Sequence, residues 1–230
     1  MYQSISLVFI MLYLPFIFSL KYYCDNHIDK NLKKSIKHFI EPYSAAWDLI
    51  LSVFSIFGTY HTFVYLYREG YSCNYDSNTI LWMDLFCMSK IPEFLDTVFI
   101  ILKGKDLILL QYYHHFATAL LTWMGNPIYP KDLVVAAFMN YFVHSIMYMY
   151  FFVTSLGIHS VRKYGFLITI LQLLQMVAAV YILITQTMES CIDKEHDMSF
   201  IYYYSVIMYS SYVLLFGKLL FEKILPKKKN

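Results

Sequence analysis

Three ionisable side chains stand at three-residue steps within a stretch of sequence that is otherwise apolar. They are Lys90, Glu93 and Asp96, with Pro92 among them as a predicted kink. Residues three apart lie on adjoining parts of one helix surface, and an ionised group at the centre of a bilayer costs about 2.5–3.5 kcal/mol on insertion scales. The three groups are therefore expected to face protein or water. A Lys90–Glu93 ion pair between packed helices is the alternative without chemistry, but it leaves Asp96 unexplained.

Histidine and amide side chains recur at helical spacing in the next three apolar stretches. In chain order these polar residues are Gln111, His114 and His115, then Asn140, His144 and Tyr148, then Thr169, Gln172 and Gln175. Imidazoles beside carboxylates suit either metal binding or acid–base and nucleophilic chemistry. Taken singly, Asn140 or Gln172 could serve only as an interhelical hydrogen bond. Together the groups predict a buried reaction site.

Composition indicates that membrane helices carry these groups. The 230 residues are 59% hydrophobic and only 15% charged, whereas soluble domains are about 45–50% apolar and about 25% charged. A soluble enzyme, a secreted disulfide scaffold and a disordered chain are therefore excluded. A membrane-crossing helix needs about 20 mostly apolar residues. Seven such helices are predicted within one all-α polytopic membrane domain covering 1–230, at roughly 5–20, 46–67, 80–102, 107–125, 132–155, 164–187 and 199–222.

The distribution of Lys and Arg predicts the orientation of these helices, because cytosolic loops are enriched in basic residues. Most basic residues outside the helices fall on the side of the C-terminus, and only Arg68, Lys131 and Lys194 fall on the other side. We therefore expect a luminal N-terminus and a cytosolic C-terminus. Residues 5–20 could instead be a cleaved signal peptide, but residues 1–4 contain no basic residue, so a retained helix is expected.

Depth within the membrane gives an independent reason to group the polar residues. Counted from the cytosolic end of each helix at 1.5 Å per residue, Glu93, His114, His144 and Gln172 lie roughly 10–16 Å deep. Four helices that run in alternating directions thus bring polar groups to one level. We expect one buried polar chamber that is open to the cytosol.

Cysteine and lysine positions add two expectations about the compartment. On this topology Cys73 and Cys191 both face the lumen, where disulfides form, and we expect them to be joined. No two of the four cysteines have the C-x-x-C spacing of a metal site, and no metal is expected. Lys227 and Lys228 stand four and three places from the end of the sequence and resemble the dilysine retrieval signal of endoplasmic reticulum membrane proteins. A solvated basic tail is the alternative.

Other classes of membrane protein also use polar groups within their helices. Membrane desaturases and hydroxylases hold two irons with several histidine boxes, but only His61, His114, His115 and His144 lie in the predicted helices, and no H-x-x-x-H box is present. A seven-helix receptor seldom needs a lysine, two carboxylates and three histidines at one depth. A proton-coupled transporter could use them, so the residues alone leave a di-iron enzyme and a transporter as alternatives.

Four motifs on successive helices resemble those of the ELO family of fatty acid elongases. The matching segments are Lys90–Thr97 (K-x-x-E-x-x-D-T), Gln111–His115 (H-x-x-H-H), Asn140–Tyr148 (N-x-x-V-H-x-x-M-Y) and Thr169–Gln175 (T-x-x-Q-x-x-Q). The motifs occur in the order of the family, and the resemblance covers about residues 45–225. Such a match is highly specific.

The resemblance differs in detail between parts of the chain. The segments Phe54–Gly58, Ser89–Lys90 and Phe99–Lys103 are most like the branch that acts on long saturated and monounsaturated acyl chains. Gln111 departs from the pattern, because most members have the first histidine of the box there. Similar Q-x-x-H-H forms occur among polyunsaturated-type elongases of lower eukaryotes, so the class of acyl chain stays open.

The resemblance implies a fold and a reaction. Seven helices are expected, six of them forming a barrel around a tunnel for the acyl chain. The reaction is the condensing step of elongation, in which acyl-CoA and malonyl-CoA give 3-oxoacyl-CoA, CO2 and CoA, with malonyl-CoA as co-substrate and no cofactor. Implied partners are these two substrates, membrane lipid, the reductase and dehydratase of the elongation cycle and a second copy of the chain, but no nucleic acid.

The resemblance also implies catalytic roles. His114 matches the middle histidine of the box and would carry the acyl group as an acyl-imidazole. His144 would orient or deprotonate the second substrate. His115, Glu93 and Asp96 would fix the imidazole tautomers, as carboxylates do for other histidines.

The remaining polar residues are assigned to substrate binding. They are Lys90, Gln111, Asn140, Tyr148, Gln172, Gln175, Lys103 and Lys105. Lys103 and Lys105, together with Arg162 and Lys163, stand at cytosolic helix ends and would attract the CoA phosphates. Charge that only sets the topology is the alternative for each of these four residues.

Overall fold

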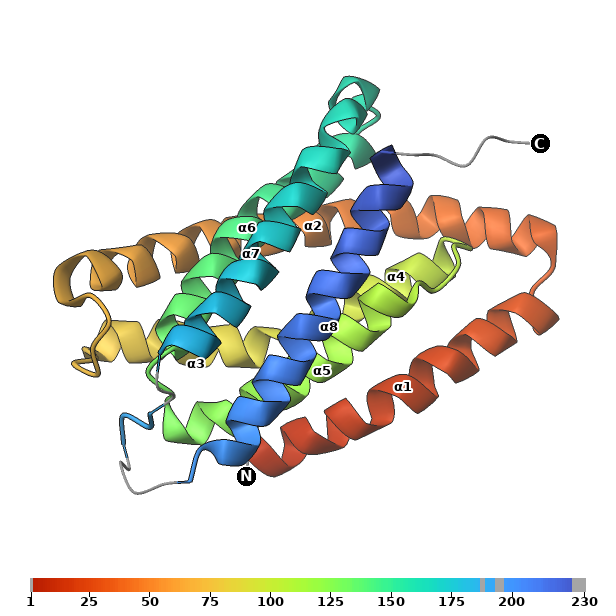
Figure 1. The fold of residues 1–230 in the computed structure, drawn as a ribbon. Helices are drawn as coiled ribbons and strands as arrows, with labels where there is room; N and C mark the ends of the chain where they lie inside the picture. The colour runs from red at the N-terminus through yellow and green to blue at the C-terminus, as the bar shows by residue number, and fades with distance from the viewer. Residues whose placement is uncertain (1, 187–188, 193–196, 225–230) are drawn as a thin grey trace.

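The computed structural model describes residues 2–186, 189–192 and 197–224, and helices make up most of them (Figure 1). The elements are α1 (Tyr2–His27), α2 (Lys30–Glu69), α3 (Ser77–Ser89), α4 (Phe94–Leu102), α5 (Leu109–Gly125), α6 (Leu133–Ser155), α7 (Gly165–Thr185) and α8 (Ser199–Ile224), with the short 3-10 helices η1 (Asn126–Ile128) and η2 (His159–Tyr164). The all-α prediction is confirmed for this part of the chain. The predicted retrieval residues, Lys227 and Lys228, lie outside the described residues.

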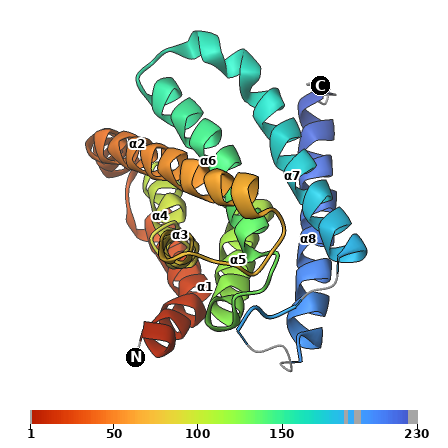
Figure 2. The same ribbon diagram turned by 90° about the vertical axis from the view of Figure 1, so that its left-hand side faces the viewer.

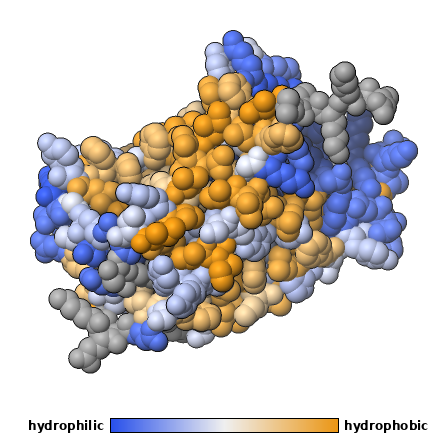
Figure 3. Space-filling model, viewed as in Figure 1, coloured by the Kyte–Doolittle hydropathy of each residue, from blue (hydrophilic) through white to orange (hydrophobic). Residues whose placement is uncertain are grey.

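Five segments among the described residues are long and apolar enough to cross a membrane. They comprise α1, α2, α6, α7 together with η2, and α8. Large apolar side chains such as Phe57, Leu174 and Leu214 remain exposed on these helices, and Figure 3 shows an apolar band between hydrophilic ends. An exposed apolar surface of this extent is typical of contact with lipid. The seven predicted spans thus correspond to five candidate spans and three shorter helices, α3, α4 and α5.

Helix α2 corrects the prediction for the segment between the first two spans. The prediction had a loop over residues 21–45, whereas α1 continues to His27 and α2 begins at Lys30. The Asp29 carboxylate caps α2 by accepting hydrogen bonds from the backbone amides of Asn31 and Leu32. At 1.5 Å per residue, α2 is about 60 Å long, roughly twice the hydrocarbon thickness of a bilayer. Hydropathy marks where a helix leaves the apolar layer, and the helix itself continues beyond that point.

The predicted third span is interrupted in the middle. Helix α3 ends at Ser89 and α4 begins at Phe94, so the kink expected at Pro92 is a break between two helices rather than a bend in one. Pro92 lies in the break, where it has no amide hydrogen to donate. Backbone amides here bond to carbonyls three residues earlier, as in Phe94 N to Ile91 O at 3.1 Å. The break falls on the segment that carries Lys90 and Glu93.

The helices pack as two long pairs with smaller contacts between them. Helix α2 lies along α6, and α7 lies along α8. Further contacts join α6 to α7 and α5 to α8. Figure 2 shows α1 at one side of the bundle, where it contacts α4 and α5. The two pairs thus lie side by side along the α6–α7 contact.

Three connections between helices meet at one end of the bundle. Cys73, between α2 and α3, forms a disulfide with Cys191, between α7 and α8, with 5.3 Å between the Cα atoms. The connection between α5 and α6 joins them, because the amide of Cys191 donates to the Tyr129 carbonyl at 3.1 Å and the amide of Lys131 to the Glu189 carbonyl at 2.9 Å. We call this the disulfide end. The predicted pairing of Cys73 with Cys191 is confirmed.

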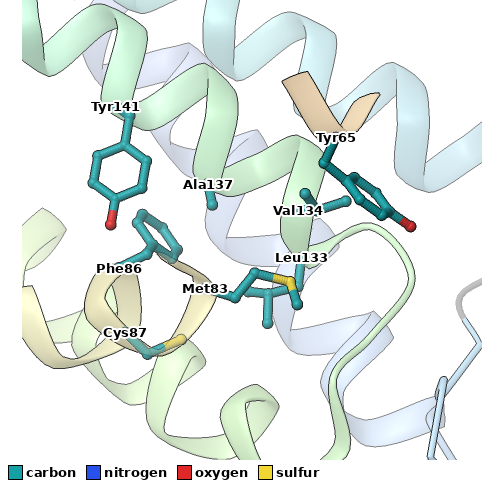
Figure 4. Close-up of a cluster of buried hydrophobic side chains, with 8 residues drawn as sticks. All are labelled: Tyr65, Met83, Phe86, Cys87, Leu133, Val134, Ala137 and Tyr141. Carbon is teal, nitrogen blue, oxygen red and sulfur yellow. The ribbon is translucent and has the colours of Figure 1, made fainter. Parts of the chain in front are cut away.

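An apolar cluster fills the space between α2, α3 and α6 (Figure 4). Its buried members are Tyr65, Met83, Phe86, Cys87, Leu133, Val134, Ala137 and Tyr141. Two helical turns before Tyr65 on α2, a methyl group at Gly58 would lie 2.6 Å from ring carbons of Tyr141. Glycine at position 58 therefore allows α2 and α6 to approach closely.

We predict that Gly58→Ala destabilises the protein by about 1–3 kcal/mol, because the added methyl overpacks the contact with Tyr141. The matched control is Gly217→Ala in α8, where nothing lies within 4 Å of the added carbon. Alanine there should stabilise the helix by about 0.5–1 kcal/mol. The measurement is the free energy of unfolding in detergent micelles. Equal stabilisation by both changes would contradict the close approach of α2 and α6.

Candidate active site

A chain of four buried polar side chains connects the α3–α4 break to α6. The ammonium of Lys90 lies 2.7 Å from Oε1 of Glu93 and 2.9 Å from Oδ1 of Asn140. Nδ2 of Asn140 lies 3.1 Å from Nε2 of His144, one helical turn further along α6. The Lys90–Glu93 ion pair considered from the sequence is thus present, but it belongs to a longer chain that includes a histidine.

The direction of these hydrogen bonds determines the proton position on His144. An ammonium can only donate, so the Asn140 atom facing Lys90 is the amide oxygen. The amide nitrogen then donates to Nε2 of His144, which must present its lone pair. In the neutral ring the proton therefore resides on Nδ1. Lys90 fixes the tautomer of His144 through Asn140.

A second polar group gathers around Asp96 in the first turn of α4. Its Oδ1 accepts a hydrogen bond from Nε1 of Trp47 in α2 at 2.8 Å, and its Oδ2 accepts one from the hydroxyl of Tyr148 in α6 at 2.6 Å. Nε2 of His115 lies 3.9 Å from Oδ2. The ring of Tyr148 also contacts His144 edge-on, with 5.3 Å between centroids. Asp96 thus lies between both histidine-bearing helices, α5 and α6.

His114 lies beside this group and contacts α8. Its ring centroid is 5.7 Å from that of His115 and 5.0 Å from that of Tyr212. The hydroxyl of Tyr212 donates to the backbone carbonyl of His114 at 3.2 Å and lies 3.0 Å from Oγ1 of Thr118. His114 is half-buried, whereas His115 is buried. Tyr212 therefore holds the turn of α5 that carries His114.

Two polar atoms in this region are buried without a hydrogen-bond partner among the described residues. They are Oε2 of Glu93 and Oε1 of Gln111. Buried acceptors normally have partners, and each one left unpaired costs about 1–3 kcal/mol. A bound molecule with donor groups, or water, would satisfy both atoms.

The other predicted binding residues lie outside these hydrogen-bonded groups. Gln172 and Gln175 are half-buried in α7, and Nε2 of Gln172 donates to the sulfur of Met147 at 3.2 Å. Lys103, which directly follows α4, donates to Oγ of Ser44 at 2.5 Å, and Lys105 is exposed. Burial lowers the pKa of Lys103, although the nearby Asp48 carboxylate opposes the shift. The exposed Lys105 is the freer of the two cations.

Sequence reasoning missed two residues of the site, Trp47 and Tyr212. Both are large aromatic residues within apolar runs, and the sequence contains 3 Trp and 23 Tyr. A buried indole N–H or phenol needs a hydrogen-bond partner, and that need is the only signal in the sequence. It does not identify which partner each ring has.

Comparison with protein families identifies the chain. The model of the ELO family, described as GNS1/SUR4, matches residues 1–230. The chain belongs to the ELO family of fatty acid elongases.

Relatives in the family are similar over different lengths. Fatty acid elongase 1 of Trypanosoma brucei brucei is 37% identical over 75% of this chain and 63% of its own length. Very long chain fatty acid elongase 4 of Trypanosoma cruzi is 38% identical over 80% of this chain and 69% of its own. Very long chain fatty acid elongase 6 of Homo sapiens is 32% identical over 98% of this chain and 86% of its own length. The chain therefore spans somewhat less than two thirds of the first relative and most of the third.

The geometry of this site suits acyl transfer. His115 lies 3.9 Å from the Asp96 carboxylate with His114 beside it on α5, and a buried ammonium lies two hydrogen bonds from His144 on α6. Neutral imidazoles can act as nucleophile and base, and a fixed positive charge can stabilise an enolate oxygen. No group of three or more His, Cys, Asp or Glu side chains able to hold a metal occurs among the described residues.

We predict that Trp47→Phe and Tyr148→Phe each lower stability by about 1.5–3 kcal/mol, because each removes one hydrogen bond to the same carboxylate. Condensing activity should fall in both, since Asp96 then loses its fixed position beside His115. The loss of unfolding free energy in the double variant should differ from the sum of the two single losses by about 0.5–3 kcal/mol. Unfolding in detergent micelles and product formation are the measurements.

The control for this cycle is Trp82→Phe, which leaves Asp96 untouched. Trp82 lies in α3, stacked on His61 with 4.9 Å between ring centroids. Additive effects of Trp47→Phe and Tyr148→Phe on the free energy of unfolding, with activity equal to that of the control, would contradict a role for the Asp96 carboxylate.

Proposed function

We propose that this elongase condenses a long-chain acyl-CoA with malonyl-CoA to give 3-oxoacyl-CoA, CO2 and free CoA. The observation that carries the proposal is the hydrogen-bonded chain from Lys90 through Asn140 to His144, next to His114 and His115. The names of the relatives refer to elongation of fatty acids, and condensation is the step that forms the new carbon–carbon bond. The alternatives of a di-iron enzyme or a transporter have no such support.

His114 is the proposed nucleophile of the first half-reaction. One of its ring nitrogens attacks the thioester carbonyl, the carbon–sulfur bond breaks, and CoA leaves as the thiol with the proton released from the imidazole. The product is an acyl-imidazole, which divides one difficult displacement into two easier steps. Tyr212 supports this role because it holds the backbone of His114.

His144 and Lys90 are proposed to act on malonyl-CoA in the second half-reaction. Loss of CO2 leaves an enolate, whose oxygen needs nearby hydrogen-bond donors or positive charge. The enolate carbon attacks the acyl carbonyl, the carbon–nitrogen bond breaks, and the departing ring nitrogen takes up a proton from water, which regenerates neutral His114. Because Asn140 occupies Nε2 of His144, the protonated Nδ1 is the atom free to donate toward the substrate.

The remaining site residues are proposed to position these groups. Asp96 orients His115, and Tyr148 and Trp47 hold Asp96. Glu93 balances the charge of Lys90. The amides of Gln111, Gln172 and Gln175 hydrogen-bond the thioester carbonyl or the pantetheine amides. The unpaired Oε1 of Gln111 supports this, because a pantetheine N–H would satisfy it.

A barrel of six membrane helices around the acyl chain, with α1 outside, is part of the proposal. The contacts that support it run in a closed order: α2 with α6, α6 with α7, α7 with α8, α8 with α5, α5 with α3, and α3 with α2. Here α3 and α4 together count as one spanning element, which gives seven spans with α1. The apolar interior would exclude water from the acyl chain.

We further propose that the protein lies in the endoplasmic reticulum membrane with a luminal N-terminus and a cytosolic C-terminus. A disulfide at one end suits an oxidising lumen. Lysines near the α1–α2 connection and within the α4–α5 connection lie at the other end, where the Lys21 ammonium lies 3.4 Å from the Asp106 carboxylate. Lys227 and Lys228 would act as the retrieval signal. The reductase and dehydratase of the cycle, and a second copy of the chain, are the expected protein partners.

We predict that His114→Ala abolishes both the covalent acyl adduct and the condensation product. The variant should be incubated with acyl-CoA alone for intact-mass analysis, and then with labelled malonyl-CoA for product formation. His159→Ala is the matched control, since His159 is exposed in η2. An adduct that persists in the His114 variant would exclude this residue as the nucleophile.

We predict that replacing Lys103 and Lys105 by Gln raises the apparent KM for both CoA substrates, because these cations attract the CoA phosphates. The effect should shrink as salt is raised, since salt screens exposed charges. The control replaces the exposed Lys30 and Lys34 at the start of α2. An unchanged KM, or an equal rise in the control, would mean that Lys103 and Lys105 only set the topology.

A further inference from the structure

A partly open cavity lies between the turn of α5 that follows the histidines and the disulfide end. It has a volume of about 60 Å³ and is bordered by α3, α5, α6, α7 and α8. On α5 its lining begins at Thr118, one helical turn beyond His114, and continues through Leu121 to Gly125. The distance from His114 to Gly125 along the helix is about 16 Å. The cavity therefore lies where an acyl chain attached to His114 would extend.

Most of the cavity wall is apolar, but a carboxyl group lines its far end. Asp132 immediately precedes α6 and borders the cavity together with Pro130 and Leu133. Its Oδ1 is buried and has no hydrogen-bond partner among the described residues. Leu133 and Phe86, which also line the cavity, belong to the apolar cluster in Figure 4. An unpaired carboxyl oxygen thus borders a cavity whose lining is mostly apolar and includes the polar side chains Thr118, Thr122, Ser205 and Tyr209.

Comparison with two other aspartates shows that helix capping does not explain this carboxyl. Asp29 and Asp76 also directly precede helices, and both accept hydrogen bonds from the first backbone amides of those helices. Asp132 makes no such capping bond. The neighbouring Lys131 does not neutralise it, since that ammonium lies 3.9 Å from Glu189 and over the ring of Tyr71. Neither helix capping nor an ion pair with Lys131 therefore accounts for the position of Asp132.

The end of an acyl chain is the group that would meet this carboxyl. A terminal methyl would cover Oδ1 without pairing it, which is unfavourable for a buried acceptor. A terminal hydroxyl would donate a hydrogen bond to it, and a carboxyl accepts such a bond in either protonation state. A site built to bond a hydroxyl discriminates strongly against the analogue that lacks it.

We propose that Asp132 is a specificity residue that selects acyl-CoA primers with a hydroxyl group at the far end of the chain. This inference rests on the proposed condensing function, because the chain must reach the cavity from His114. The preference should appear only at the chain length that brings the terminal group to Asp132. Shorter primers should be elongated equally well with either ending.

The test compares pairs of saturated acyl-CoA primers of equal length, one ending in methyl and one in hydroxyl, with labelled malonyl-CoA. The ratio of kcat/KM for the two endings should reach about tenfold in favour of the hydroxyl at one length, as expected for one buried hydrogen bond. In Asp132→Leu the ratio should fall to one or below. Asp132→Ala serves the same purpose where the leucine variant does not fold.

The control is Asp84→Asn, because Asp84 already accepts a hydrogen bond from the Tyr129 hydroxyl at 2.5 Å and does not line the cavity. It should keep the wild-type ratio. Elongation with a ratio near one at every length would overturn the inference and leave the condensing function intact. A preference that survives in the Asp132 variants would also overturn it. No elongation of any primer by folded protein would overturn both proposals.

Discussion

The buried ion pair between Lys90 and Glu93 is the constraint on which the rest of the site depends. Removing two charges from water costs several kcal/mol each, and the mutual attraction offsets this only with good geometry and further hydrogen bonds. Asn140 and Ser89 supply those bonds, from α6 and from the end of α3. The helix is broken at this pair, so the backbone turns where the charged groups lie. A straight helix would direct Lys90 and Glu93 differently.

The position of α6 therefore determines the chemistry of His144. Asn140 links the lysine to the histidine, and Tyr148 on the same helix links α6 to Asp96. The long contact of α6 with α2, which requires glycine at position 58, fixes its distance from α4. Trp47 adds a direct bond from α2 to Asp96. Packing far from the reacting atoms thus decides which ring nitrogen of His144 carries the proton.

The two ends of the bundle differ in ways that suit their proposed tasks. Hydrogen bonds and a disulfide join three connections at the disulfide end, and Pro130 and Asp132 from one of these connections border the cavity. The opposite end carries Lys103 and the exposed Lys105, with α2 extending past the apolar layer. A rigid end can select the length and the terminal group of an acyl chain, whereas a charged end suits the highly anionic CoA group.

The sequence by itself determined the helical class, the residues of the four motifs and the pairing of Cys73 with Cys191, because hydropathy, helical spacing and compartment act along the chain. It misplaced the start of α2, because charge marks the edge of the membrane rather than the end of a helix. It anticipated a kink at Pro92, where the structure has a break between α3 and α4. Only the tertiary structure decided that Trp47 meets Asp96, that Tyr212 holds His114 and that Asp132 lines a cavity. Helical spacing identifies the surface a side chain occupies, but its partner depends on which helix packs against that surface.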